Sequence, residues 1–225
     1  MIKNVLIPTL LLIACKAQAE NTVYAVIDLP PFGCQPTEEM GCINTEYTQV
    51  VADVIDDGSG TIQAFPYPRA LSMFESGQSP ILVALANKRL IERAYITIEL
   101  YCGEFYLVSM KRAAPQGRKT ISYLRGADAQ KEIAAFVNAT PYEVNDYRQI
   151  DVMLTANRLD YVIIPRYMYE HEAGSVFRNA EVLSKHRLPI VLYVSKQASP
   201  HLERIKAALS QASLSGAEQY RYLFP

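Results

Sequence analysis

The sequence predicts a mixed α/β fold. Two observations carry this prediction: one well-marked segment, 64–96, and an alternation of apolar runs with amphipathic stretches along the chain. In the segment, Pro68 suits the first position of a helix, and Gly77 suits the position where a helix ends. The helix between them has one apolar face, formed by Ala70, Leu71 and Phe74. The run Ile81–Leu85 is then expected to be a strand covered on both faces in a parallel sheet, which makes a βαβ-like unit.

The other expected elements alternate in the same way. Thr45 is a favourable N-cap residue for a helix whose apolar stripe is formed by Val50, Val51, Val54 and Ile55. Asp128 is the expected N-cap of a later helix, and Ser199-Pro200 begins the last one. Strands are expected over 22–28, 61–65, 95–101, 104–110, 120–124, 161–164 and 188–194. Helices are expected over 45–57, from 128 onward, around 151–157, over 167–173 and from 199 onward.

The composition narrows the range of functions. With 225 residues, 50% of them hydrophobic, the chain can form a sizeable core as one domain or as two small lobes. The net charge of −1 provides no basic field that would attract nucleic acid. The three histidines lie far apart, and no phosphate-binding loop, nucleophile elbow or His-Glu-x-x-His motif occurs. Neither a cofactor nor a metal site is therefore expected.

The first 19 residues have the parts of a secretory signal peptide. Lys3 supplies the positive charge, residues 5–14 form the apolar region, and Ala17-Gln18-Ala19 is the cleavage site. The apolar run is too short to span a bilayer. Residues 12–15 (LIAC) also resemble a lipobox, which would leave Cys15 lipidated and the protein anchored to a membrane. Soluble export to the periplasm is favoured, because the cleavage site lies at a natural distance from the apolar region.

Export places the remaining cysteines in an oxidising compartment. Cys34 and Cys42 flank a loop rich in glycine and proline, and a local disulfide between them is expected. Zinc binding is the rival interpretation, but two thiols without a nearby histidine supply only half of the ligands that zinc needs. Cys102 lies in an apolar strand and is expected to be a small buried hydrophobic residue.

The segment PYPRALSMFESGQSPILVAL, with Glu92-Arg93 after it, resembles the first lobe of the bacterial extracellular solute-binding proteins of family 3. These are the amino-acid-type binding proteins of ABC importers. The resemblance implies a two-lobed fold of the periplasmic-binding-protein type II, with a ligand cleft between the lobes. It divides the mature chain into lobe 1 over 20–110, lobe 2 over 111–190, and a return to lobe 1 over 191–225.

The resemblance also indicates ligand-binding residues. Arg93 takes the position of the family's arginine, whose fork of N–H donors binds a ligand carboxylate in bidentate fashion. Phe32 and Tyr67 are the expected aromatic contacts, although each could instead simply pack beside the cleft. Asp28 ends the first strand, at the edge where open α/β sheets usually bind ligands, and Arg69 is a weaker candidate than Tyr67.

Two departures from the family argue against an ordinary α-amino acid as the ligand. Leu90 stands where the family has a threonine or serine that helps to hold the carboxylate. Pro165 stands where the family often has an aspartate that binds the ammonium group. Arg166, Tyr167 and Tyr169 follow at the same strand end and could contact the ligand instead.

The expected function is therefore that of a monomeric periplasmic solute-binding protein that is not an enzyme. Its ligand would be small, and anionic if Arg93 points into the cleft. An ABC permease or a membrane sensor would be the partner that detects closure of the lobes. Two alternatives stay open: a dehydratase-like enzyme with Glu92 or Glu104 as general acid, and an accessory lipoprotein that acts by protein contact.

Overall fold

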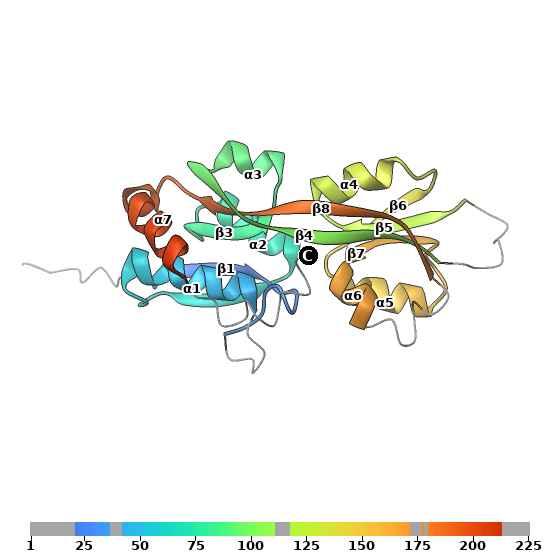
Figure 1. The fold of residues 1–225 in the computed structure, drawn as a ribbon, viewed down its shortest axis with the longest axis horizontal. Coiled ribbons are helices and arrows are strands. Elements are labelled where there is room, and N and C mark those ends of the chain that lie inside the picture. Colours follow the sequence, from blue (N-terminus) through green and yellow to red (C-terminus); the bar gives the residue numbers. More distant parts are fainter. Residues whose placement is uncertain (1–20, 37–41, 111–117, 172–176, 178–179, 213–225) are drawn as a thin grey trace, which may run out of the picture.

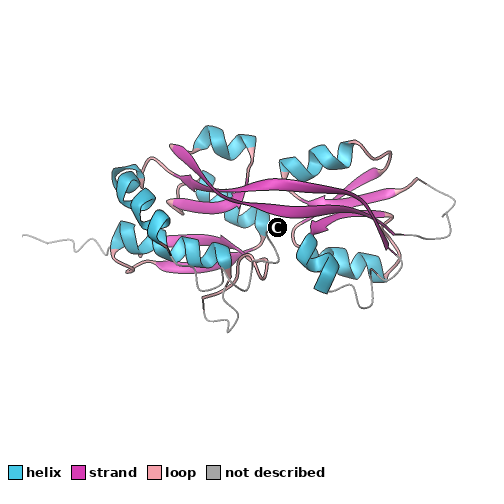
Figure 2. Ribbon diagram, viewed as in Figure 1, coloured by secondary structure: helices cyan, strands magenta, loops and turns pink. Residues whose placement is uncertain are grey.

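The structure, a computed structural model, describes residues 21–36, 42–110, 118–171, 177 and 180–212. The chain forms two lobes that lie side by side and are joined by two long strands running through both (Figure 1). Helices lie on both sides of the strands in each lobe (Figure 2). The signal peptide and the lipobox predicted for the N-terminus lie outside the described residues.

The first lobe contains the N-terminal elements and the last helix. Strands β1 (Val23–Ile27) and β2 (Thr61–Phe65) form a two-stranded parallel sheet. The other elements of this lobe are α1 (Ile43–Asp56), α2 (Tyr67–Glu75), β3 (Ile81–Leu85), α3 (Lys88–Arg93), the 3-10 turn η1 (Ser199–His201) and α7 (Leu202–Gln211). Helix α7 packs against α1, so the two ends of the described chain meet in one lobe.

The second lobe has its own set of strands and helices. They are β5 (Thr120–Leu124), α4 (Asp128–Ala135), β6 (Thr140–Val144), α5 (Tyr147–Thr155), β7 (Tyr161–Pro165) and α6 (Arg166–His171). Strand β5 pairs in parallel with both β6 and β7. Under α4, a small apolar cluster of this lobe packs Ile133 against Ile121 and Ile163.

The long strands β4 (Ile96–Met110) and β8 (Ala180–Val194) pair antiparallel and cross from lobe to lobe. They lie in the middle of a six-stranded sheet with the order β3-β8-β4-β7-β5-β6. At the crossing Cys102 lies opposite Pro189, and Gly103 comes next. Proline cannot donate a ladder hydrogen bond, and glycine adds no packing side chain. We therefore propose that the chain changes lobe inside these strands, whereas the sequence predicted limits after residues 110 and 190.

Several expected elements are confirmed and others are wrong. The strands over 61–65, 81–85 and 120–124 occur as predicted. The expectation that Ile81–Leu85 belongs to a parallel sheet is wrong, because β3 pairs antiparallel with β8. A continuous apolar run reflects burial on both faces and carries no information about strand direction. The two strands expected over 95–101 and 104–110 are one strand, β4, because its pairing with β8 continues through Cys102 and Gly103.

Two predicted N-caps are also wrong. Helix α1 begins at Ile43, so Thr45 lies inside its first turn and is buried. Its hydroxyl instead accepts a hydrogen bond from the Cys34 N–H (3.1 Å) and donates one to the Cys34 carbonyl (2.9 Å). Asp128 is the first residue of α4, and the cap position is taken by Ala127 without a side-chain hydrogen bond. Tertiary contacts decide where these helices begin.

The cysteines are placed partly as expected. Cys34 and Cys42 form the predicted disulfide, which ties the segment after β1 to the start of α1. Cys102 is a free thiol, and it is partly exposed on β4 rather than buried. No helix in the described part of the chain is both long and apolar enough to cross a membrane.

Candidate functional site

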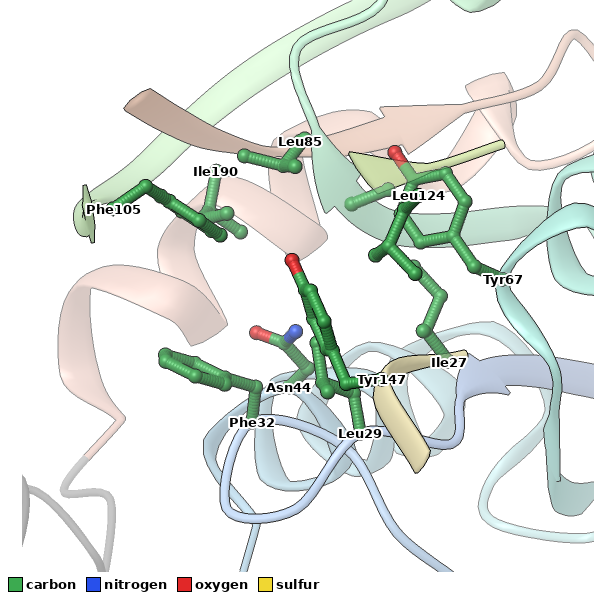
Figure 3. A pocket seen from close by; sticks show the side chains of 11 residues that line it. Ile27, Leu29, Phe32, Asn44, Tyr67, Leu85, Phe105, Leu124, Tyr147 and Ile190 are labelled. Atoms are coloured by element: carbon green, nitrogen blue, oxygen red, sulfur yellow. The ribbon is translucent and has the colours of Figure 1, made fainter. Parts of the chain in front are cut away.

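A small pocket lies between the two lobes, next to the crossing of β4 and β8 (Figure 3). Its volume is about 30 Å³. The first lobe contributes the ends of β1 and β3 together with side chains from α1 and α2, and the second lobe contributes Leu124 and Tyr147. The full lining consists of Ile27, Leu29, Phe32, Asn44, Tyr67, Ala84, Leu85, Phe105, Leu124, Tyr147 and Ile190. These walls are mostly apolar.

Three polar contacts join the lobes around this pocket. Nδ2 of Asn87, which is buried, donates to the carbonyl oxygen of Gly126 in the second lobe (2.7 Å). The guanidinium of Arg148 on α5 pairs with Asp28 after β1 (3.2 Å). The ammonium of Lys88 pairs with Glu132 of α4 (2.9 Å), where both side chains are largely exposed. In this structure the lobes are therefore closed on each other.

Asn87 is the best anchored of these contact residues. Its Oδ1 accepts from the Leu90 N–H (3.1 Å), which caps the start of α3. Its backbone N–H donates to the Tyr193 hydroxyl (2.8 Å), and that hydroxyl donates to the Leu85 carbonyl (2.8 Å). The network therefore connects the end of β3, the start of α3 and the second lobe in one set of hydrogen bonds.

The polar groups of the pocket are oriented by their neighbours. The Leu124 N–H donates to Oε1 of Gln130 (3.0 Å), so the other end of this amide, Nε2, donates to the Tyr147 hydroxyl (2.7 Å). The Tyr101 hydroxyl likewise donates to Oδ1 of Asn44 (2.6 Å). The hydroxyl of Tyr67 is buried and has no hydrogen-bond partner among the described residues.

Burial keeps the pocket tyrosines protonated. Desolvation raises the pKa of the Tyr67 hydroxyl well above its usual value, and the nearby Tyr193, Tyr147 and Asp128 raise this pKa further. Desolvation likewise raises the pKa of Tyr147. Both hydroxyls are therefore neutral phenols that can donate a hydrogen bond at any physiological pH.

The raised pKa values predict loss of stability at high pH. An unfolded chain releases tyrosine protons near pH 10, whereas Tyr67 and Tyr147 in the folded protein keep theirs. Near and above pH 10 the folded state therefore binds more protons than the unfolded state. These two groups leave the free energy of unfolding unchanged well below pH 10 and lower it as the pH rises through 10. Between pH 9 and 11 each buried tyrosine contributes an average slope of about 0.7 kcal/mol per pH unit, because the unfolded phenol is on average half ionised there, and the slope approaches about 1.4 kcal/mol per pH unit at higher pH. Urea unfolding between pH 9 and 11 measures this slope, which Tyr67→Phe should reduce by one such contribution. An unchanged slope would contradict the prediction.

Comparison with solved structures identifies the fold of this chain. An ancestral arginine-binding protein bound to arginine superposes with a TM-score of 0.69 at 14% identity, over 91% of this chain and 99% of that one. The GluR0 ligand-binding core from Nostoc punctiforme gives a TM-score of 0.65 at 13% identity, over 90% and 99%. The chain has the two-lobed periplasmic-binding-protein fold. The VFT2 domain of BvgS from Bordetella pertussis has a TM-score of 0.63 at 15% identity, over 90% and 91%. No protein-family model matches the chain, and no curated protein matches it by sequence.

Within this periplasmic-binding-protein fold, the predicted site residues are only partly brought together. Phe32 and Tyr67 line the pocket, on its first-lobe side (Figure 3). Asp28 does not line it, but its carboxylate makes the interlobe pair with Arg148. Arg69 and Arg93 are exposed, on α2 and at the end of α3, and neither lines the pocket.

Of the three residues predicted at the end of β7, Tyr167 packs against the cluster of Phe32 and Ile43 beside the pocket, and the other two contact β4 or α6. Arg166 pairs with Glu104 of β4 (3.1 Å) and with Glu170 one helical turn later (2.8 Å). Neighbouring Tyr169 packs edge-on against Tyr106. These contacts fix α6 against the long strand, and the described lining of the pocket includes none of them.

Sequence reasoning missed most of the pocket's far wall. Tyr147, Leu124 and Asn44 line it, although no motif indicates them. Leu124 ends the parallel strand β5 and Tyr147 follows β6 closely, and strand ends are where open α/β sheets bind ligands. That rule could have indicated both residues. Nothing comparable was available for Asn44, which lies in the first turn of α1.

Proposed function

We propose that this chain captures a small ligand between its two lobes in the periplasm, and that a membrane partner detects the closed form. The partner would be an ABC permease or a membrane sensor. The observation that carries the proposal is the pocket itself, which takes its lining from both lobes and is surrounded by contacts between them. Interfaces between lobes are among the places where ligand-binding pockets occur preferentially.

The geometry also offers a way for the lobes to open. Only β4 and β8 join the lobes within the described chain, and both cross beside Gly103 and Pro189. A few residues at such a crossing can absorb the change in backbone angles that a hinge needs. Opening would separate Leu124 and Tyr147 from Phe32 and expose the pocket walls to a ligand.

The position of Arg93 removes the reason for expecting an anionic ligand. An anionic ligand was expected if Arg93 pointed into the cleft, and Arg93 is exposed outside the pocket. Arg148, nearer to the interface between the lobes, is paired with Asp28. The proposal therefore rests on the enclosed pocket and does not depend on a charged anchor.

No observation favours the enzymatic alternative. Glu92 is exposed on α3, and Glu104 is paired with Arg166. Neither residue lines the pocket, so neither is placed as a general acid there. Within the described residues, no group of three or more His, Cys, Asp or Glu side chains could hold a metal ion.

Thermal and chemical unfolding of the mature chain, in the presence of a library of small solutes, tests the proposed function. At one hundred times its dissociation constant, a ligand that binds only the folded state adds about 2.7 kcal/mol to the free energy of unfolding. We expect Arg93→Ala to keep this stabilisation and Phe32→Ala to lose it. If the Phe32→Ala protein folds and a ligand still stabilises it fully, the ligand binds elsewhere and this pocket is not the site. A library in which nothing stabilises the protein would contradict ligand capture.

A further inference from the structure

The polar atoms that the pocket can offer a ligand are hydrogen-bond donors. The Tyr147 hydroxyl accepts from Gln130, so its own proton is left to donate, and the hydroxyl points into the pocket (Figure 3). The Tyr67 hydroxyl is buried without a partner among the described residues. Asn44 uses its oxygen to accept from Tyr101, so the group of this side-chain amide that remains is the nitrogen, which is also a donor. A ligand that satisfies these groups must carry an acceptor.

The electrostatics of the pocket disfavour a charged ligand of either sign. No lining residue is ionisable apart from the two neutral tyrosines, so a buried charge would have no counter-charge. The charged side chain that acts on Tyr67 is the carboxylate of Asp128, which repels an anion. A cation is disfavoured as well, because it needs hydrogen-bond acceptors and the side chains of the pocket offer donors. The free-energy cost of burying an uncompensated charge is far larger than the stabilisation from one neutral hydrogen bond.

We propose that the pocket selects a small uncharged ligand with an apolar body and one hydrogen-bond acceptor, such as a carbonyl oxygen, that binds the hydroxyls of Tyr67 and Tyr147. This inference rests on the proposed function of ligand capture. The apolar body lies against Phe32, Leu85 and Ile190, and the acceptor lies toward the tyrosines. The unpartnered Tyr67 hydroxyl is then satisfied only in the complex, which makes it a determinant of specificity.

The size of the pocket indicates how such a ligand enters. The cavity of about 30 Å³ in this closed form has room for little more than a water molecule. A cavity that holds benzene needs about 150 Å³. A ring-sized ligand therefore enters when the lobes separate, and it holds Leu124 and Tyr147 farther from the first lobe than they stand here.

Three probes of nearly equal shape separate charge from hydrogen bonding: acetophenone, benzoate and cumene. Acetophenone is neutral with an acceptor, benzoate is an anion, and cumene has no acceptor. We expect calorimetric titration to show acetophenone binding at least about tenfold more tightly than either of the others, which corresponds to one hydrogen bond. Tyr67→Phe should weaken acetophenone binding by about the same factor and leave cumene unchanged. Tyr106→Phe, which removes the hydroxyl of a buried tyrosine residue outside the pocket, is the matched control and should change neither.

The outcomes distinguish this inference from the proposed function. Benzoate binding more tightly than acetophenone, or acetophenone binding that is unchanged in Tyr67→Phe, would overturn the uncharged ligand class. If an amino acid or another charged solute binds and Phe32→Ala abolishes its binding, the pocket captures ligands but the inference about charge is wrong. If no probe and no solute of the wider library binds, both proposals fail. Because Tyr67→Phe removes an unpaired buried hydroxyl, the variant is expected to melt at or above the wild-type temperature, so loss of folding does not obscure the result.

Discussion

Replacing Gly33 by alanine is expected to destabilise the protein by about 3 kcal/mol, at the upper end of the range for overpacking. A Cβ on Gly33 would lie 2.0 Å from the carbonyl oxygen of Ile27 and 2.9 Å from Cγ1 of Val26. The first of these is a backbone atom at the end of β1, and it cannot move without disturbing the sheet. The backbone of Gly33 also makes two hydrogen bonds with Leu29 (2.8 and 2.9 Å), so it cannot shift away from Ile27 without breaking them. Urea unfolding measures the loss.

The same substitution should impair the pocket, because Phe32 precedes Gly33 and forms part of the pocket wall. Gly77→Ala is the matched control. Gly77 has a positive φ of 75°, but nothing lies within 4 Å of a Cβ placed there. Its cost is limited to backbone strain, about 1 kcal/mol. If Gly33→Ala proves no more harmful than Gly77→Ala, the close approach to Ile27 is not the reason for a glycine at this position.

Replacing Asn87 by alanine is expected to lower the free energy of unfolding by about 2 to 3 kcal/mol. About 1 kcal/mol comes from the lost cap of α3, where Oδ1 accepts from the Leu90 N–H. The remainder comes from the lost hydrogen bond to Gly126 in the second lobe, a partly buried contact whose acceptor is left without this donor. The same loss should shift the lobes toward an open arrangement. Chemical unfolding measures the first effect, and small-angle X-ray scattering measures the second as a larger radius of gyration.

Asp146→Ala provides the comparison for Asn87→Ala. Asp146 caps α5 in the same way, by accepting from the Gln149 N–H (3.1 Å), but it makes no contact with the first lobe that matches the Asn87–Gly126 bond. Its loss should cost about 1 kcal/mol and leave the radius of gyration unchanged. If both variants lose the same stability and neither changes shape, Asn87 acts as a helix cap alone.

Much of the fold could be predicted from short-range patterns. Helix α2, in whose first turn Pro68 lies, the strand Ile81–Leu85 and the disulfide between Cys34 and Cys42 follow from local chemistry: a fixed proline φ, a run of apolar side chains, and two thiols beside a tight loop. Strand β6 was not predicted, because Thr140, Pro141 and Tyr142 are exposed and show no alternation. Its existence depends on the ladder that β5 provides.

The candidate site could be predicted only in part. Phe32 and Tyr67 lie next to proline segments that mark strand ends, and both line the pocket. Arg93 was selected because it takes the position of the carboxylate-binding arginine in the family that the sequence resembles, yet the turn of α3 leaves it exposed. A residue type that suits a ligand does not determine the direction in which its side chain points. That direction depends on the helix phase and on the surface against which the helix packs.

By itself, the sequence determined most of the segments that form helices and strands, with α3 and β6 as exceptions, and it also determined that both α and β elements are present and which two cysteines pair. These properties depend on neighbours within a few residues. The tertiary structure alone decided that β4 and β8 run unbroken through both lobes, that β3 is antiparallel to β8, and that Tyr147 faces Phe32 across a pocket. Such contacts join residues 70 or more positions apart in the sequence. Apolar periodicity reports that a face is buried but contains no information about which distant surface covers it.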